Sequence, residues 1–340
     1  MSATEAVEET TTDGASSGPI LEAVDLTKHF PVRKGLLSSK LMVQAVDQVS
    51  FGVNPGEALG LVGESGCGKT TTGRMLVRLL EPTAGKLLYD GRDITRLKGQ
   101  QLRKLRQDVQ IIFQDPYASL NPRHTVGKII STPMHVNRIG TKATIKKRVQ
   151  ELMELVGLNP EHYNRFPHEF SGGQRQRIGI ARALALRPKV IIADEPVSAL
   201  DVSIQAQVVN LLRELQRELG LAFVFIAHDL SIVRHFCDRI AVMYLGKVVE
   251  VGDRQQIYET PSHPYTKALL SAVPDVTKLG DQGSQRVKLE GEVPTPLNPP
   301  SGCRFRTRCW KAKEICATTE PPLEKTSTGG VAACHFPEEH

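Results

Sequence analysis

The stretch Gly63-Glu-Ser-Gly-Cys-Gly-Lys69-Thr70 decides the fold class, because it matches the spacing Gly-x-x-x-x-Gly-Lys-Thr without a mismatch. Residues 57–62 before it indicate a short buried strand, and residues 71–80 after it have helical apolar spacing. Glycine lets the backbone wrap closely around phosphate oxygens, while the loop amides and the following helix N-terminus face the anion. We therefore predict a phosphate-binding loop between a strand and a helix.

The loop residues have different expected tasks. Lys69 should reach the β- and γ-phosphates of a nucleotide, and the Thr70 hydroxyl should ligate Mg²⁺. Cys67 occupies a variable position, where we interpret it as a tolerated small residue rather than a redox switch. The residues expected to contact ATP in this segment are Gly63, Glu64, Ser65, Gly66, Cys67, Gly68, Lys69, Thr70 and Thr71.

A second segment, Val190-Ile-Ile-Ala-Asp194-Glu195, supplies two carboxylates directly after an apolar run. Such a run is typical of a central strand in a parallel sheet, and ligands bind at the carboxyl ends of such strands. We expect Asp194 to hold the Mg²⁺ shell and Glu195 to polarise the attacking water as the catalytic base. The predicted chemistry is phosphoryl transfer to water, promoted by positioning and charge stabilisation.

Composition describes an ordinary globular chain of 340 residues, with 40% hydrophobic and 24% charged residues. No run approaches the roughly 18 apolar residues that span a bilayer. Residues 1–19 carry four acidic residues and no Lys or Arg, so we predict a disordered N-terminal tail rather than a signal peptide. The net charge of +6 is a small excess of basic residues, and without interleaved aromatic residues we expect no nucleic-acid partner.

A third segment, Phe170-Ser-Gly-Gly-Gln174, narrows the class. A nucleotide-binding chain with Ser171, Gly172, Gly173 and Gln174 upstream of its Asp-Glu pair resembles the ATPase subunits of ABC transporters. The resemblance covers about residues 20–255. It implies that this motif is presented to the ATP of a partner subunit, so that ATP binding closes a head-to-tail dimer and hydrolysis releases it. Phe170 stands where many members have Leu, an apolar exchange that leaves the motif intact.

The same resemblance assigns four further positions. Gln114 is similar to the glutamine that contacts Mg²⁺ and water and connects to the membrane subunit. The segment Ser198-Ala-Leu-Asp201 resembles the loop that crosses the dimer interface, and Asp201 is its candidate interface residue. His228 is similar to the switch histidine that contacts the γ-phosphate, and Phe30 is the candidate aromatic that stacks on adenine.

The fold expected from these signals is an α/β ATPase with a doubly wound parallel-sheet core. Residues 20–55 suit the antiparallel β subdomain of the family, and about residues 116–180 suit its helical subdomain. Beyond about residue 255 the composition shifts to a proline-rich, loop-rich extension over 256–340. This extension is too long to be a simple terminus.

Several segments resemble one branch, the dipeptide and oligopeptide importer ATPases. They are residues 115–122, 194–207, 261–270 and 299–305. The resemblance implies an importer built from two different but homologous ATPase subunits, two transmembrane permease subunits and an extracytoplasmic substrate-binding protein. This chain would then sit peripherally on the cytoplasmic face of the inner membrane. Import of nickel, glutathione or another small solute stays an alternative, as does a subunit of a non-transport enzyme complex; an ABC ATPase acting on DNA or the ribosome is disfavoured by the single uninterrupted unit.

Four of the six cysteines lie in the extension, at Cys303, Cys309, Cys316 and Cys334. Stable disulfides are not expected in the cytosol, so a metal site is a reasonable interpretation. The C-x2-4-C pairs typical of zinc are missing, and four spread cysteines can hold a [4Fe–4S] cluster. The resemblance to peptide-importer ATPases favours the iron–sulfur cluster, with zinc and free thiols as the alternatives.

Overall fold

The central sheet has eight strands in the order β11-β12-β10-β9-β3-β8-β7-β6, as the computed structural model shows for residues 18–32, 41–115, 117–272, 287, 289 and 291–338. The tail expected to be disordered over 1–19 lies, except for Gly18 and Pro19, outside the described residues. Five neighbouring strands of the sheet run parallel, and the remaining pairs are antiparallel. The strands are β3 (Ala58–Val62), β6 (Val109–Ile112), β7 (Val190–Asp194), β8 (Ala222–Ala227), β9 (Arg239–Tyr244), β10 (Lys247–Asp253), β11 (Glu324–Lys325) and β12 (Val331–Ala332).

The apolar composition of the parallel strands explains why they lie in the centre of the sheet. Every residue of β3, β7 and β8 is buried, and these strands are rich in Val, Ile, Leu, Phe and Ala, as expected where helices cover both faces of a sheet. Val62 pairs with Ala227, and Asp194 pairs with Ile226. The three strands therefore end at the same edge, and the residues that follow them converge there.

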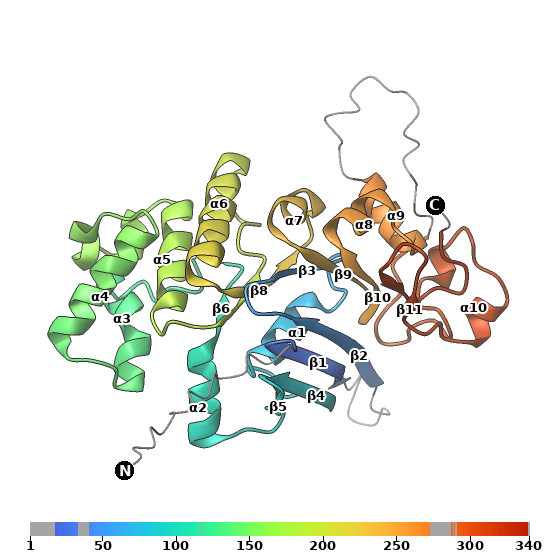
Figure 1. Cartoon of the computed structure of the whole chain (residues 1–340), viewed down its shortest axis with the longest axis horizontal. Helices are drawn as coiled ribbons and strands as arrows, with labels where there is room; N and C mark the ends of the chain where they lie inside the picture. The colour runs from blue at the N-terminus through green and yellow to red at the C-terminus, as the bar shows by residue number, and fades with distance from the viewer. Residues whose placement is uncertain are drawn as a thin grey trace, which may run out of the picture.

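A second, four-stranded antiparallel sheet has the order β2-β1-β4-β5. Its first two strands are β1 (Leu21–Val32) and β2 (Leu41–Val53), which confirms the strands expected over 20–55. β4 (Ala84–Tyr89) and β5 (Arg92–Asp93), which follow the first helix, complete this sheet outside the region where the sequence predicts it. Figure 1 shows this sheet below the central one.

The helices cover the sheet and extend beyond it (Figure 1). α3, α4 and α5 gather at one end of the molecule, as expected for a helical subdomain, and pack on one another. α6 and α7 lie beside β8 in the same view. The bounds are α1 (Lys69–Leu76), α2 (Gly99–Asp108), α3 (Val126–Asn137), α4 (Lys142–Leu155), α5 (Gly172–Leu184), α6 (Val202–Leu219), α7 (Leu230–Phe236), α8 (Arg254–Glu259), α9 (Pro264–Ser271) and α10 (Ile315–Thr318), with 3-10 turns η1 (Pro160–Asn164), η2 (Pro167–Glu169) and η4 (Arg306–Arg308).

The C-terminal extension, meaning the described residues from 256 to 338, is built into the fold rather than appended to it. Its strand β12 pairs with β10, so the extension adds two strands to the central sheet. The fully buried carboxylate of Glu250, on β10, accepts the backbone N–H groups of Ser262 at 2.7 Å and His263 at 2.9 Å. Buried carboxylates need such donors, so these bonds fix the turn before α9 against the sheet.

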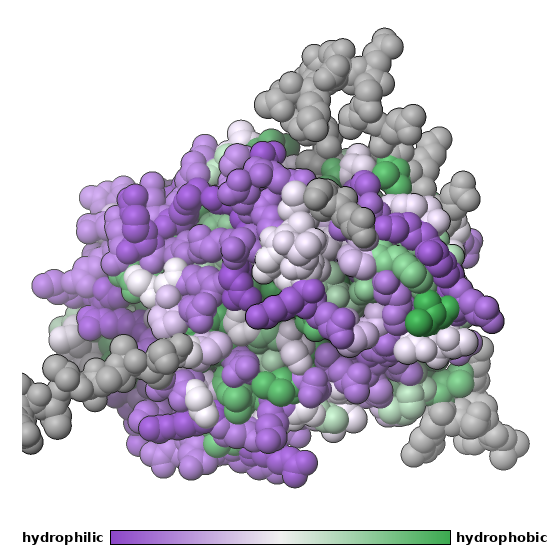
Figure 2. Space-filling model, turned by 45° about the vertical axis from the view of Figure 1, so that its right-hand side comes forward, coloured by the Kyte–Doolittle hydropathy of each residue, from purple (hydrophilic) through white to green (hydrophobic). Residues whose placement is uncertain are grey.

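The face of the molecule drawn in Figure 2 is mainly hydrophilic. Figure 2, in which the C-terminal extension is turned forward, shows separate hydrophobic patches among predominantly polar side chains. Within the described ranges, none of the helices has both the length and the apolar character needed to cross a membrane.

Candidate active site

The phosphate loop follows β3 and leads directly into α1, as the sequence predicts. Gly68 has φ 108°, and a β-carbon there would collide with the carbonyl oxygen of Ala45 on β2. Gly63 has φ 152°, and a β-carbon there would collide with the carbonyl oxygen of Met243 on β9. Both positions therefore require glycine for backbone conformation and for space.

Lys69 lies at the first position of α1, with 4% of its surface exposed. Its ammonium group donates to the carbonyl oxygens of Gly63 at 2.8 Å and Glu64 at 2.9 Å. The charged group is thus buried and held by two backbone carbonyls of the loop.

Thr70 and Asp194 come together although they are far apart in sequence. The Thr70 hydroxyl donates to Asp194 Oδ1 at 3.1 Å, across α1 and β7. Burial raises the pKa of Asp194, while the Thr70 bond and the charge of Arg74 act in the opposite direction. A hydroxyl and a carboxylate side by side are oxygen ligands of the kind Mg²⁺ prefers.

Glu195 is the centre of a three-residue contact at the same edge. Its Oε2 accepts from Gln114 Nε2 at 3.0 Å and lies 3.2 Å from His228 Nδ1. Glu195 has φ 45°, an uncommon backbone conformation for a residue with a side chain, and its amide donates to Ile226 O at 3.0 Å. Such strain is typical of functional positions, because the surrounding structure must hold it.

The Ser-Gly-Gly-Gln motif begins α5. Ser171 caps the helix by accepting the amide of Gln174, whose side chain in turn accepts the amide of Ser171 at 3.0 Å. A β-carbon on Gly173 would meet Ile204 of α6 at 2.5 Å, so this glycine sets the α5–α6 approach. Asp201 occupies the N-cap position of α6. Figure 1 shows α5 well away from α1, so the motif and the phosphate loop do not meet within one chain.

Two other predicted residues have less direct places. Phe30 lies half-buried on β1, paired with Val43 of β2, close to the strand segment whose Ala45 carbonyl touches the loop. Its ring faces the ammonium group of Lys28, 5.2 Å from the centroid. For Cys67, burial raises the thiol pKa, with a smaller opposing effect of Lys69. Burial favours the protonated, less reactive thiol, in keeping with the interpretation of Cys67 as a tolerated small residue rather than a redox switch.

The C-terminal extension reaches the phosphate loop through two of its side chains. Arg308 Nη1 lies 2.8 Å from Glu64 Oε2. The Tyr265 hydroxyl oxygen accepts the backbone N–H of Glu64 at 2.9 Å. Neither residue was among the predicted site residues, because the chain folds back over more than 200 residues to make these contacts. Their only sequence signal is indirect: Tyr265 lies in a segment typical of the importer branch, and Arg308 precedes Cys309.

The four cysteines of the extension form a neighbourhood but not a ready-made metal site. Burial is the largest cause of the raised pKa of Cys303 and of the pKa of about 11 for Cys334, and the charges of neighbouring cysteines raise both further. The Cys303 amide donates to the Cys316 carbonyl at 2.8 Å. Yet, over the ranges that the structure covers, no three or more His, Cys, Asp or Glu side chains are arranged to hold a metal ion. The expected cluster is therefore not confirmed.

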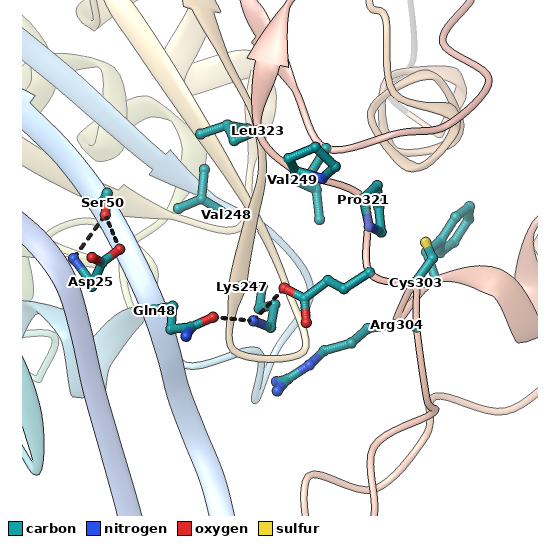
Figure 3. A pocket seen from close by; sticks show the side chains of 15 residues that line it. Asp25, Gln48, Ser50, Lys247, Val248, Val249, Cys303, Arg304, Pro321 and Leu323 are labelled. Atoms are coloured by element: carbon teal, nitrogen blue, oxygen red, sulfur yellow. Dashed lines mark hydrogen bonds and ion pairs between the residues drawn. The ribbon is translucent and has the colours of Figure 1, made fainter. Parts of the chain in front are cut away.

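A cavity of about 250 Å³ lies where the extension meets the antiparallel sheet (Figure 3). Lys247 projects into it between Gln48 at 3.2 Å and Glu320 at 2.6 Å, with Arg304 behind. None of the loop residues 63–71 lines it. It belongs to the packing of the extension and is separate from the candidate active site.

Comparison with known proteins agrees with this geometry. Residues 46–198 match the family model of the ABC transporter, and residues 249–316 match the model described as the oligopeptide/dipeptide transporter C-terminal region. The chain is 53% identical to the oligopeptide transport ATP-binding protein AppF of Bacillus subtilis, covering 95% of this chain and 98% of AppF. It is 51% identical to the dipeptide transport ATP-binding protein DppF of Escherichia coli, covering 93% and 94% of the two chains.

Solved structures resemble the cassette. The ATP-binding cassette MJ0796, in a dimeric post-hydrolysis state bound to ADP and Pi, superimposes with a TM-score of 0.62 at 29% identity, covering 69% of this chain and 98% of that one. CbiO1 from Clostridium perfringens gives a TM-score of 0.62 at 29% identity, covering 72% and 92%. The fold, the motif geometry and the relatives agree: the chain belongs to the ATP-hydrolysing subunits of ABC transporters, in the branch that carries the oligopeptide/dipeptide C-terminal region.

Proposed function

We propose that this chain powers the import of di- or oligopeptides across the cytoplasmic membrane by ATP-driven closure of a subunit dimer. The observation that carries the proposal is the meeting of the phosphate loop, Asp194, Glu195, Gln114 and His228 at one sheet edge, in a chain whose C-terminal region matches that of peptide transporters. Its relatives include proteins described as oligopeptide and dipeptide transport ATP-binding proteins.

ATP and Mg²⁺ are the cofactors expected of an ABC ATPase, and the residues present fit them. The loop amides and Lys69 would bind the β- and γ-phosphates, while Thr70, Asp194 and Gln114 supply oxygen atoms suited to Mg²⁺. Bound Mg²⁺ supplies neutralisation of phosphate charge. Glu195 would orient and polarise the attacking water, with its carboxylate held by Gln114 and His228, and His228 would contact the γ-phosphate.

The separation of α5 from α1 supports assembly as a head-to-tail dimer. Ser171, Gly172, Gly173 and Gln174 of one subunit would face the ATP of the other, with Asp201 at the interface. The partner we propose is a second, homologous ATPase, giving a heterodimer. On the membrane side we propose two permease subunits, contacted near residues 115–122, and an extracytoplasmic substrate-binding protein. The ATPase would lie peripherally on the cytoplasmic face.

The experiment is to tag the chain in its native cell, solubilise the membranes gently and identify what co-purifies. Two polytopic membrane proteins, a second ATPase and a solute-binding protein would support the importer, and the ligand of that binding protein would name the cargo. If the binding protein carries nickel or glutathione instead, that solute rather than peptides would be the cargo. Recovery of soluble enzymes alone would contradict the transport function.

For the extension we propose a [4Fe–4S] cluster held by Cys303, Cys309, Cys316 and Cys334. Its support is that all four thiols are free and that the Cys303 amide donates to the Cys316 carbonyl at 2.8 Å, which joins two of the four segments. The thiols would have to turn toward one another to bind. Such a cluster would staple a segment that has little core of its own.

Anaerobic purification with cluster-assembly factors tests this proposal. The protein should be brown, and its iron content should fall in Cys303→Ser and Cys316→Ser. Cys237→Ala, which removes a thiol buried in the central core, is the matched control and should keep its iron. A colourless, iron-free wild-type protein would exclude the cluster. Stoichiometric zinc in that protein would show that the cysteines form a zinc site instead.

A further inference from the structure

We propose that the C-terminal extension is part of the nucleotide site: Arg308 and Tyr265 act as positioning residues that hold the phosphate loop through Glu64. This inference rests on the proposed role of residues 63–71 in binding phosphate. It assigns a task in ATP binding to a region distant in sequence from the nucleotide motifs.

Glu64 is held at each of its polar groups. Its backbone N–H donates to the Tyr265 hydroxyl at 2.9 Å, and its carbonyl accepts from Lys69 at 2.9 Å. Its carboxylate pairs with Arg308 at 2.8 Å. Two of these partners come from the extension, and the third is Lys69 of the phosphate loop. The extension and Lys69 therefore contact the same residue.

The grip is buried. The side chain of Arg308 is only 8% exposed and that of Glu64 is 25% exposed, so solvent screens their attraction less than that of a surface ion pair. Tyr265 is fully buried. Removing either partner therefore leaves a polar group of Glu64 without its bond in a partly dry environment.

A rigid aromatic cluster supports both positioning residues. The rings of Tyr244, Tyr265 and Phe305 have centroids 4.7 to 5.4 Å apart, and all three side chains are fully buried. Phe305 immediately precedes η4 and Arg308 ends it, and the Arg308 amide donates to the Phe305 carbonyl at 2.9 Å. The cluster thus packs β9, α9 and the start of η4 against one another. Through Tyr265 and Arg308, this packing fixes the position of Glu64 in the phosphate loop.

Two physical effects follow for nucleotide binding. A glycine-rich loop loses much conformational freedom when it wraps a phosphate chain, so a loop already held in place binds more tightly. In addition, Arg308 neutralises a carboxylate that would otherwise repel a triphosphate from within its own binding loop. Both effects act before hydrolysis, so they should change nucleotide affinity much more than the rate of the chemical step.

The test compares binding of the fluorescent analogue TNP-ATP by variants of the full chain. Arg308→Met should weaken binding about tenfold, because it removes the charge but keeps much of the side-chain length. Arg308→Lys should restore most of this loss, and Tyr265→Phe, which removes only the hydroxyl, should cost about threefold. In the purified transporter complex, KM for ATP should rise by similar factors while kcat changes less than about twofold.

The matched control is Arg306→Met, in the same turn, whose guanidinium bonds to Ser301 and, among the described residues, to no carboxylate of the phosphate loop. It should leave binding unchanged. A double-mutant cycle with Glu64→Gln separates direct coupling from a general loss of structure: the double variant should bind no worse than Arg308→Met alone. Losses that multiply in the double variant, or equal losses in Arg306→Met and Arg308→Met, would overturn the inference.

Lys69→Ala separates this inference from the proposed loop function. If Lys69→Ala abolishes TNP-ATP binding while Arg308→Met and Tyr265→Phe bind normally, the loop keeps its function and the positioning role is wrong. If Lys69→Ala binds normally, the proposed loop function itself fails. Thermal unfolding of each variant verifies that the protein is folded.

Discussion

Glu195 concentrates the expected chemistry of the active site on one carboxylate. It lies just beyond β7, in an unusual backbone conformation, and contacts both Gln114 and His228. The amide of a glutamine at this position could keep the same neighbours by hydrogen bonding, but it could not accept a proton from water. Substitution of Glu195 by Gln therefore tests the loss of the catalytic base while the arrangement of the neighbouring side chains is kept.

Glu195→Gln should bind ATP normally and lower hydrolysis at least about 100-fold, because the base is lost while the site keeps its shape. TNP-ATP binding and phosphate release by the transporter complex measure the two effects. Glu218→Gln, at the exposed end of α6, serves as the control and should keep full activity. Undiminished phosphate release by Glu195→Gln would remove Glu195 from its assigned role.

His263 gives a residue-scale prediction about stability and pH. Its side chain is 1% exposed, its Nδ1 accepts the amide of Tyr265 at 3.0 Å, and burial lowers its pKa to about 3. As pH falls below the unfolded-state pKa of about 6.5, the unfolded chain binds a proton that the folded chain resists. The stabilisation is therefore complete above pH 6.5 and is lost progressively toward pH 3.

Between pH 7 and pH 5 the wild-type protein should lose about 2 kcal/mol more folding free energy than His263→Asn, whose amide can cap α9 without titrating. Denaturant unfolding at pH 7, 6 and 5 measures this difference. Parallel pH profiles for the two proteins would show that His263 is protonated in the folded state.

At the scale of elements, Ser171 has two separable tasks. It caps α5, and it is proposed to face the ATP of the partner subunit. Ser171→Ala should cost about 1 kcal/mol of stability through the lost cap. Ser171→Asp keeps an acceptor for the cap but places a negative charge toward phosphate, so stability should be retained.

Phosphate release by the assembled transporter should fall steeply in both Ser171 variants if the residue also contacts ATP. Ser171→Thr, which keeps hydroxyl and cap, is the control. Normal hydrolysis in Ser171→Asp would limit Ser171 to its capping role. The N-terminus of α5 would then have only a structural role, and the proposed contact of Ser171 with the ATP of the partner subunit would be wrong.

At the scale of the whole molecule, the extension and the cassette share one core. Phe305 packs among Tyr244 and Tyr265, and the buried Arg304 reaches Gln44, Asp47 and the Leu245 carbonyl on the cassette side. The single tryptophan of the chain, Trp310, lies in the extension, so its fluorescence reports unfolding of this region.

Fluorescence of Trp310 and circular dichroism should show the same unfolding midpoint in the wild-type protein, since the shared core makes unfolding cooperative. Phe305→Ala should cost about 3–5 kcal/mol and separate the two midpoints, with the fluorescence transition coming first. Leu323→Ala, at a half-exposed position of the extension, is the control and should keep them coincident. Separate midpoints in the wild-type protein would show that the extension folds independently.

The sequence by itself determined the parts of this protein that depend on local chemistry. The glycine spacing in the loop and the apolar run of β7 each carry their own conformational signal. Residues 57–80 therefore predicted a strand, loop and helix, and Asp194 and Glu195 were expected at the carboxyl end of a strand in a parallel sheet. His228 came from the family resemblance.

Only the tertiary structure decided how the extension relates to the nucleotide site. The contacts of Arg308 and Tyr265 with Glu64 join residues more than 200 positions apart, and no periodicity or motif spacing encodes such a pairing. The same holds for β12 beside β10, because an edge strand of two residues has no pattern of its own. Long-range contacts of this kind are selected by packing of the whole chain, which local sequence signals do not specify.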